Sequence, residues 1–141
     1  MKVKGLNNKV YIIDSKKYVI KNNDTRKKRS SFHIMARDLL KDVFCGYLIL
    51  EEVKLPGSTC PSKKSVLFLD FLVPTFNLGI EVHGRQHYEY CQFFHKTKAG
   101  FLDQKRRDSV KESWCELNNI NLIVFNYADD IQIWRKQLEC I

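Results

Sequence analysis

Four short segments of the chain are rich in apolar residues that alternate with polar ones or run together, and both patterns predict β-strands. They are residues 47–53, 65–73, 77–84 and 120–125. The last segment is almost entirely apolar, which is typical of a buried strand. Pro74–Asn77 separates the second segment from the third and has the composition of a tight turn. We therefore expect these two segments to pair as an antiparallel hairpin.

Two longer segments have apolar residues at the three-to-four spacing of an amphipathic helix. The first covers residues 32–43, with Ser30–Ser31 as its cap and an end before Gly46. The second covers residues 98–119, and a short amphipathic helix is expected to start at Asp129–Asp130. The order α-β-β-β-α-β predicts an α/β fold.

The N-terminal part of the chain has a pattern of its own. Residues 9–20 predict two short strands around Asp14–Lys17, and a polar, basic connection follows them. We expect this hairpin to be a small appendage. The predicted division is residues 1–29 for the hairpin and its connection, and residues 30–141 for the core domain.

The net charge says more about the class of binding partner than the overall composition does. The chain has 141 residues and a hydrophobic share of 44%, which is ordinary for one globular domain. The net charge of +8 has the sign expected of a protein that meets a polyanion such as nucleic acid. No apolar run is long enough to span a bilayer and no signal-peptide pattern is present, so we expect a cytoplasmic protein. Five cysteines without a C-x-x-C pair favour reduced thiols.

Two carboxylates interrupt the predicted hairpin. Counting outward from a Val73–Leu78 pair places Asp70 opposite Glu81, with His83 on the same face of the sheet. The other face is entirely apolar and is expected to be core: Leu67, Leu69, Phe71, Val73, Leu78, Ile80 and Val82.

Two like charges opposite each other are unfavourable, so we expect a positive group between Asp70 and Glu81. Their oxygens, with the carbonyl oxygen of Val82, suit a hard cation such as Mg²⁺ or Mn²⁺, which would make a bound water more acidic. Neutral histidine can accept a proton near neutral pH, which makes His83 and His87 candidate bases. The alternative is that one acid faces solvent, the other pairs with a lysine or arginine, and the histidines only hydrogen-bond their neighbours.

Asp70, a gap, and then Glu81-Val82-His83 resembles the signature of PD-(D/E)XK nucleases, with histidine where the signature has lysine. Residues 32–127, and above all "IEVHGRQH", are similar to the very-short-patch-repair-like branch, which includes phage homing endonucleases. The resemblance implies a restriction-endonuclease-like αβββαβ core with a mixed central sheet flanked by helices. It also implies a metal-dependent endonuclease of a bacterium or a phage-infected cell, with no organic cofactor.

By the same resemblance, Asp70 and Glu81 hold the metal, and the Val82 carbonyl completes the ligand set. His83 takes the place of the lysine. Either His83 or His87 is the base that deprotonates the attacking water. This part of the resemblance leaves the choice between the two histidines open.

Asp108 matches an acidic residue near the start of the family's second core helix and would orient His87 or a metal-bound water. The first core helix departs from the family, because it lacks the acidic residue that many members carry there. Its polar residues give no assured substitute: His33, Asp38 and Asp42.

Basic residues that follow the predicted site are candidates for contacts with the DNA backbone: Lys98, Lys105 and Arg106. A second basic group, residues 26–29, would extend that surface or is a soluble linker. For any single basic residue a solvated helix face is the simpler explanation. A zinc site is a further alternative, which needs a continuous helix and the ligands His87, Cys91, His95 and Cys115.

The sequence thus predicts a Mg²⁺-dependent endonuclease that nicks or cuts DNA, as a monomer or a homodimer, by attack of an activated water that leaves a 5′ phosphate. A different class of function is a nucleic-acid-binding module that kept the fold without catalysis, with His83 as the mark of a decayed site. A third is a structural or phage-host interaction protein whose basic surface meets an acidic protein.

Overall fold

The computed structural model describes residues 1–20, 29–59 and 65–140, and its centre is a four-stranded sheet in the order β3-β4-β5-β6. The strands are β3 (Leu50–Leu55), β4 (Leu67–Val73), β5 (Leu78–His83) and β6 (Asn121–Asn126). β3, β4 and β5 are antiparallel neighbours, and β6 runs parallel to β5. The α/β fold with a mixed central sheet is therefore confirmed.

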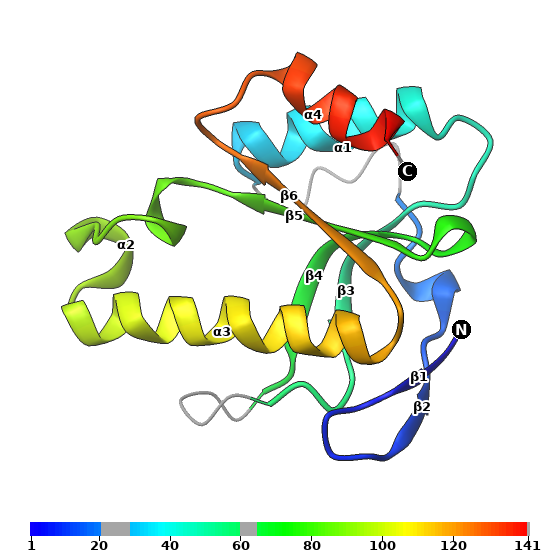
Figure 1. The fold of residues 1–141 in the computed structure, drawn as a ribbon, viewed down its shortest axis with the longest axis horizontal. Coiled ribbons are helices and arrows are strands. Elements are labelled where there is room, and N and C mark those ends of the chain that lie inside the picture. Colours follow the sequence, from blue (N-terminus) through cyan, green and yellow to red (C-terminus); the bar gives the residue numbers. More distant parts are fainter. Residues whose placement is uncertain (21–28, 60–64, 141) are drawn as a thin grey trace.

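Helices cover both faces of this sheet (Figure 1). α1 (Ser31–Val43) and α4 (Ile131–Glu139) lie together on one face, and α3 (Lys98–Leu117) lies on the other. Ser30 caps α1 and Asp130 caps α4, because each side chain accepts backbone N–H groups of the first helical turn. These helices and their caps were predicted from the sequence.

The connection from β5 to α3 contains two short elements. A 3₁₀ turn, η3 (Arg85–His87), follows β5 directly, and α2 (Gln92–His95) precedes α3. Thr97 caps α3 by accepting the backbone N–H of Gly100. Within the described ranges of the chain, no helix is both long and apolar enough to cross a membrane.

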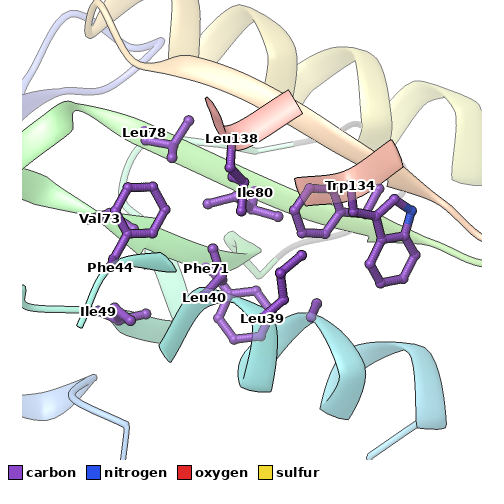
Figure 2. Close-up of a cluster of buried hydrophobic side chains, with 12 residues drawn as sticks. Leu39, Leu40, Phe44, Ile49, Phe71, Val73, Leu78, Ile80, Trp134 and Leu138 are labelled. Carbon is purple, nitrogen blue, oxygen red and sulfur yellow. The ribbon is translucent and has the colours of Figure 1, made fainter. Parts of the chain in front are cut away.

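The larger hydrophobic core fills the space between the sheet and the pair α1 and α4 (Figure 2). Trp134 of α4 stacks on Phe125 of β6, with 4.8 Å between the ring centroids. The core also joins side chains of α1 to side chains of the sheet, among them Leu39, Leu40, Phe71, Leu78 and Ile80. This packing holds β4, β5 and the first turn of α1 in fixed positions.

A second core lies on the opposite face of the sheet, under α3. Trp114 of α3 is fully buried there. Val3 and Ile13 of the N-terminal segment belong to the same core, and the Asn118 side chain bonds both backbone polar groups of Lys4. The N-terminal segment is thus packed against the core domain, and the predicted division at residue 29 stays a prediction.

The N-terminal hairpin lies earlier in the chain than predicted. β1 (Lys2–Lys4) pairs with β2 (Val10–Ile12), so only the first of the two strands expected in residues 9–20 forms. The Asp14 side chain then accepts a backbone N–H and closes a 3₁₀ turn, Ser15–Lys17. A residue that caps a helical turn ends the strand there, and the partner strand comes from the N-terminus instead.

β4 does not keep one side toward the same core along its whole length. Leu69 belongs to the second core, whereas Phe71 belongs to the first. The change occurs at Asp70, which has no partner in the described register with β3, where the opposite residue Glu52 has a positive φ of 51°. The expectation that Leu69 and Phe71 share one apolar face is therefore wrong, because the strand is irregular at the carboxylate between them.

β6 is less buried than its apolar sequence predicted. It is the last strand of the sheet and pairs only with β5 in the described register. Phe125 is its one fully buried residue, and most of the others are half-buried. An apolar run does not distinguish a central strand from a strand at the edge of a sheet, where one long side stays uncovered.

Candidate functional site

The hairpin of β4 and β5 has the turn that the sequence predicted. A 3₁₀ turn, η2 (Pro74–Phe76), is followed by Asn77 in the left-handed region, with φ of 47°. Asparagine tolerates this conformation better than most residues. Val73 pairs with Leu78 as expected, and this pair sets the register for the two carboxylates.

Asp70 and Glu81 are adjacent in this register and connect the strands with their side chains. The backbone ladder ends at Phe71–Ile80, one step before them. Asp70 Oδ2 accepts the backbone N–H of Val82 at 2.8 Å, and Glu81 Oε1 accepts the backbone N–H of Asp70 at 3.3 Å. The predicted juxtaposition of the two acids is present.

Glu81 is buried, with a relative exposure of 2%, and an ammonium and an imidazole approach its Oε2. Lys111 Nζ lies 3.1 Å away and His83 Nε2 lies 3.7 Å away. Burial opposes ionisation of Glu81, but His83 and Lys111 outweigh it and hold the pKa of this carboxyl below its usual range. Glu81 is therefore ionised at neutral pH.

Asp70 is compensated less well. Its Oδ1 lies 3.9 Å from Nδ1 of the His33 imidazole. Burial and the nearby charge of Glu81 raise the pKa of Asp70 to about 7, although the Val82 N–H favours the carboxylate. A second carboxylate charge beside the ionised Glu81 is therefore unfavourable without a further cation.

The donor set fits a hard divalent cation. Asp70 and Glu81 line one cleft of about 330 Å³, and Val82 lines it beside them. Carboxylate and carbonyl oxygens are the ligands that Mg²⁺ and Mn²⁺ prefer, and a cation would offset the nearby negative charge that raises the Asp70 pKa. These three residues are thus the ones that could hold a metal.

His83 and His87 lie face to face beside the carboxylates. Their ring centroids are 4.0 Å apart and their planes differ by 10°. His87 Nδ1 lies 2.9 Å from Asp108 Oδ2, which is the contact that the family resemblance implied. Gln104 donates to the other oxygen of Asp108 at 3.1 Å.

The Asp108 contact decides which nitrogen of His87 can act as a base. Burial opposes ionisation of Asp108, but the hydrogen bond with His87 outweighs it and holds the pKa of this carboxyl below its usual range. An ionised carboxylate accepts a hydrogen bond from Nδ1–H, so the lone pair of the neutral imidazole lies on Nε2. His87 also lines the cleft of Asp70 and Glu81. The geometry thus favours His87 over His83, whose Nε2 already faces Glu81.

His83, His87 and Asp108 also bring one ligand atom each within 4.8 Å of one another. Parallel stacked rings direct their nitrogen lone pairs side by side rather than toward one point, so hydrogen bonding fits this group better than tetrahedral coordination. The alternative zinc site is wrong, because α2 and η3 do not form one helix and Cys115 is buried in the second core. In the described ranges, no second group of this kind gathers His87, Cys91, His95 and Cys115.

Three residues of α3 that were not among the predicted site residues line the cleft: Gln104, Arg107 and Lys111. Their spacing of three and four residues places them on one face of the helix, together with Asp108. That spacing was the available signal. It was obscured because this face is polar at the site and becomes apolar only at Trp114.

His33 also reaches the site, although no role was assured for it from the sequence. Its Nε2 lies 3.2 Å from Glu51 Oε2, and its ring stacks on Phe71 with 4.7 Å between centroids. Glu51 is also held by Arg37, at 2.6 and 2.7 Å, and by Arg29 at 3.0 Å. Burial opposes ionisation of Glu51, but the bonds from His33 and Arg37 outweigh it and lower its pKa to about 2.

The basic residues predicted to contact DNA lie outside the cleft. Lys98 is exposed at the start of α3, and Lys105 Nζ lies 5.3 Å from the ring centroid of Tyr88. Arg106 is exposed and pairs with Asp103 at 3.3 Å. In the second basic group, residues 26–28 lie outside the described ranges. Its last member, Arg29, belongs to the buried Glu51 network.

Comparison with known proteins gives relatives that are themselves uncharacterized, and no family model matches the chain. Uncharacterized protein 307L of Invertebrate iridescent virus 6 is 41% identical over 62 residues, which are 44% of this chain and 32% of that protein. Uncharacterized protein 033L of Invertebrate iridescent virus 3 is 39% identical over 62 residues, with the same coverage. Uncharacterized protein 094L of Frog virus 3 is 35% identical over 79 residues, 55% of this chain and 51% of that protein. The chain thus spans between about a third and about half of the length of these curated relatives.

Proposed function

We propose that this protein is a metal-dependent DNA endonuclease whose active site is the cleft of Asp70 and Glu81. The observation that supports it best is the arrangement of the buried Glu81, the half-buried Asp70 and the His87–Asp108 pair around one open cleft. Lys111 adds a cation to the same wall. Together with the resemblance to PD-(D/E)XK nucleases, this arrangement favours hydrolysis of a phosphodiester bond.

Each side chain has a defined part in that reaction. Asp70, Glu81 and the Val82 carbonyl would hold Mg²⁺ or Mn²⁺, and when bound the ion acidifies a water and neutralises charge on the phosphoryl oxygens. His87 Nε2 takes the proton of the attacking water, and Asp108 stabilises the imidazolium that forms. The water oxygen bonds to phosphorus and the bond to the 3′ oxygen breaks, and this oxygen takes a proton from solvent water to leave as a 3′ hydroxyl, with the phosphate on the 5′ side.

His83 and Lys111 support Glu81 rather than the water. Both approach Oε2 of Glu81 and keep the carboxylate ionised. Lys111 thereby provides, from α3, a positive charge near the position where the family signature has lysine. Its ammonium also lines the cleft, where it can compensate charge on a phosphate.

The proposed substrate is DNA, and the net charge of +8 is the feature that favours a polyanion. Lys98, Lys105 and Arg106 would add contacts with the backbone outside the cleft. A cytoplasmic location, a repair-like or homing role and a homodimer stay predictions. The sequence relatives in viruses are compatible with an enzyme that acts on DNA during infection.

Cleavage of supercoiled plasmid tests the proposal. We expect the wild-type protein to nick or linearise plasmid with Mg²⁺ or Mn²⁺ but not with EDTA. Asp70→Asn and Glu81→Gln should lower the rate by about 10²-fold or more, since each removes a metal ligand. Asp38→Asn changes an exposed carboxylate of α1 and is the matched control, which should cut like the wild type.

The contrary result is equally clear. If the wild-type protein binds plasmid but leaves it intact with both metals, the catalytic proposal fails. The non-catalytic nucleic-acid-binding module then replaces it. If the protein shows no salt-sensitive DNA binding at all, an interaction with an acidic protein becomes the better explanation of its basic surface.

A further inference from the structure

A second cavity, of about 350 Å³, shares lining residues with the cleft of Asp70 and Glu81. The shared residues are Gln86, Gln104 and Arg107. The remaining wall comes from His95 at the end of α2 and from Gly100 and Asp103 in the first turns of α3. The reaction proposed above uses none of the residues of that remaining wall.

His95, which lines this cavity, carries a hydrogen-bond donor that has no partner in the described structure. Its Nδ1 accepts the backbone N–H of Cys91 at 3.0 Å, so the ring proton is on Nε2. The Nε2 atom is buried and has no hydrogen-bond partner among the described residues. A buried donor without an acceptor is unfavourable, and it therefore points to an acceptor that comes from another molecule.

The surroundings of His95 favour a negatively charged acceptor. Arg107 uses one nitrogen to donate to Gln104 Oε1 at 3.0 Å, and a guanidinium has further N–H donors. Asp103 is the one acid that lines this cavity in the described structure, and its carboxylate is engaged by Arg106. The described lining thus combines one cation, Arg107, and neutral donors from His95 and the side-chain amides with one carboxylate that is paired with Arg106.

Gly100 brings His95 close to α3. A Cβ atom at Gly100 would collide with the carbonyl oxygen of His95, so glycine is required for this approach. The N-cap bond from Gly100 to Thr97 lies in the same turn. The positions of His95 and Arg107 relative to each other are therefore built into the start of α3.

We propose that this cavity is a phosphate subsite that binds the phosphodiester next to the one held at Asp70 and Glu81. The identity of the ligand as a nucleic-acid strand rests on the proposed function. Arg107 and Lys111 lie one turn apart on α3, about 6 Å along the helix, which suits successive phosphates of one strand. Lys111 faces the first phosphate, and Arg107 with His95 Nε2–H binds the second.

Binding in EDTA tests the subsite without any need for cleavage. The probe is fluorescein-labelled oligothymidine, and its affinity is measured by fluorescence anisotropy over a range of salt concentrations. Arg107→Gln should reduce the slope of log K against log salt by about 0.7, because one phosphate contact of a single strand is lost. Arg135→Gln is the matched control, since Arg135 pairs with Asp42 on the other side of the sheet, and its slope should equal that of the wild type.

The histidine is tested by a pair of variants. His95→Leu removes the donor and should weaken binding about tenfold with an unchanged salt slope, because the lost group is neutral. His95→Gln keeps an N–H near the position of Nε2 and should restore most of the affinity. A subsite for free phosphate would instead bind inorganic phosphate in a way that depends on Arg107, while oligothymidine binding does not depend on Arg107.

That last result overturns the assignment to a strand, and so does an equal loss of slope in Arg107→Gln and Arg135→Gln. If His95→Leu binds oligothymidine with wild-type affinity, His95 Nε2–H is not part of the subsite. If binding depends on Arg107 but plasmid is never cut, the subsite stands and the proposed hydrolysis fails. If plasmid is cut and neither Arg107→Gln nor His95→Leu changes binding, the hydrolysis stands and the subsite fails.

Discussion

Two histidine–carboxylate pairs flank the acids of the cleft, and they differ in what surrounds them. His33 approaches Glu51 at 3.2 Å on the side of α1, and His87 approaches Asp108 at 2.9 Å on the side of α3. The residue types and the distances are nearly the same. The remaining partners of each carboxylate separate the two pairs.

Glu51 is enclosed by cations, whereas Asp108 is not. Arg37 and Arg29 hold both oxygens of Glu51, whose side chain is only 6% exposed, so its charge is satisfied inside the protein. Asp108 has the neutral amide of Gln104 as its other partner. A carboxylate surrounded by arginines thus stabilises the fold, while one that faces mainly a histidine can change the protonation of that histidine.

The largest expected difference between the two pairs is in the rate of cleavage after each carboxylate is replaced by its amide. Asp108→Asn places an amide N–H opposite His87 Nδ1, which leaves the imidazole proton on Nε2 and removes the base. We expect the rate of plasmid nicking to fall about 10³-fold, with the thermal midpoint nearly unchanged. Glu51→Gln, assayed where it is fully folded, should cut at close to the wild-type rate. Equal rates for Asp108→Asn and the wild type would remove His87 as the base.

We expect Glu51→Gln to lower the free energy of unfolding more than Asp108→Asn does. Glu51→Gln removes the buried carboxylate that Arg37 and Arg29 share, which should lower the free energy of unfolding by about 4 kcal/mol. Urea unfolding followed by tryptophan fluorescence measures this change. Glu116→Gln, at an exposed position of α3, is the control and should stay within about 0.5 kcal/mol of the wild type. A small effect of Glu51→Gln would mean that the arginines find other partners.

The smallest expected effect is the pH dependence of the stability that Glu51 contributes. The folded-state pKa of Glu51 is lowered to about 2 from its usual 4.5, so its contribution to stability is present above pH 4.5 and is lost as the pH falls toward 2. That contribution is about 3 kcal/mol for a shift of this size. The difference in unfolding free energy between the wild type and Glu51→Gln should therefore narrow across this range. A constant difference from pH 6 to pH 2.5 would show that Glu51 titrates normally in the folded state.

The sequence could predict the hairpin and its acids because the relevant contacts are local. The turn at Pro74–Asn77 and the pair Val73–Leu78 set the register within a few residues, and the adjacency of Asp70 and Glu81 follows from it. Helix caps are local in the same way, which is why Ser30 and Asp130 were identified correctly. The order of the main helices and strands of the core followed from periodicity alone.

Other features depend on how distant segments pack, and the sequence did not predict them. The irregular position in β4 at Asp70 arises where β3 and β4 lose a backbone pair, so the alternating pattern of apolar residues fails there. The first strand of the N-terminal hairpin begins at Lys2, because Val3 is buried under α3. β6 is half-buried because it lies at the edge of the sheet.

The sequence by itself thus determined an α/β chain with two carboxylates side by side on one hairpin. The groups that contact these carboxylates depend on the tertiary structure. Lys111 reaches Glu81 across 30 positions of the sequence, and Arg107 lines both the cleft and the cavity of His95. The reason is physical. Hydrogen bonds and side-chain period act over a few residues, whereas the polar face of α3 meets the sheet only after both hydrophobic cores have packed.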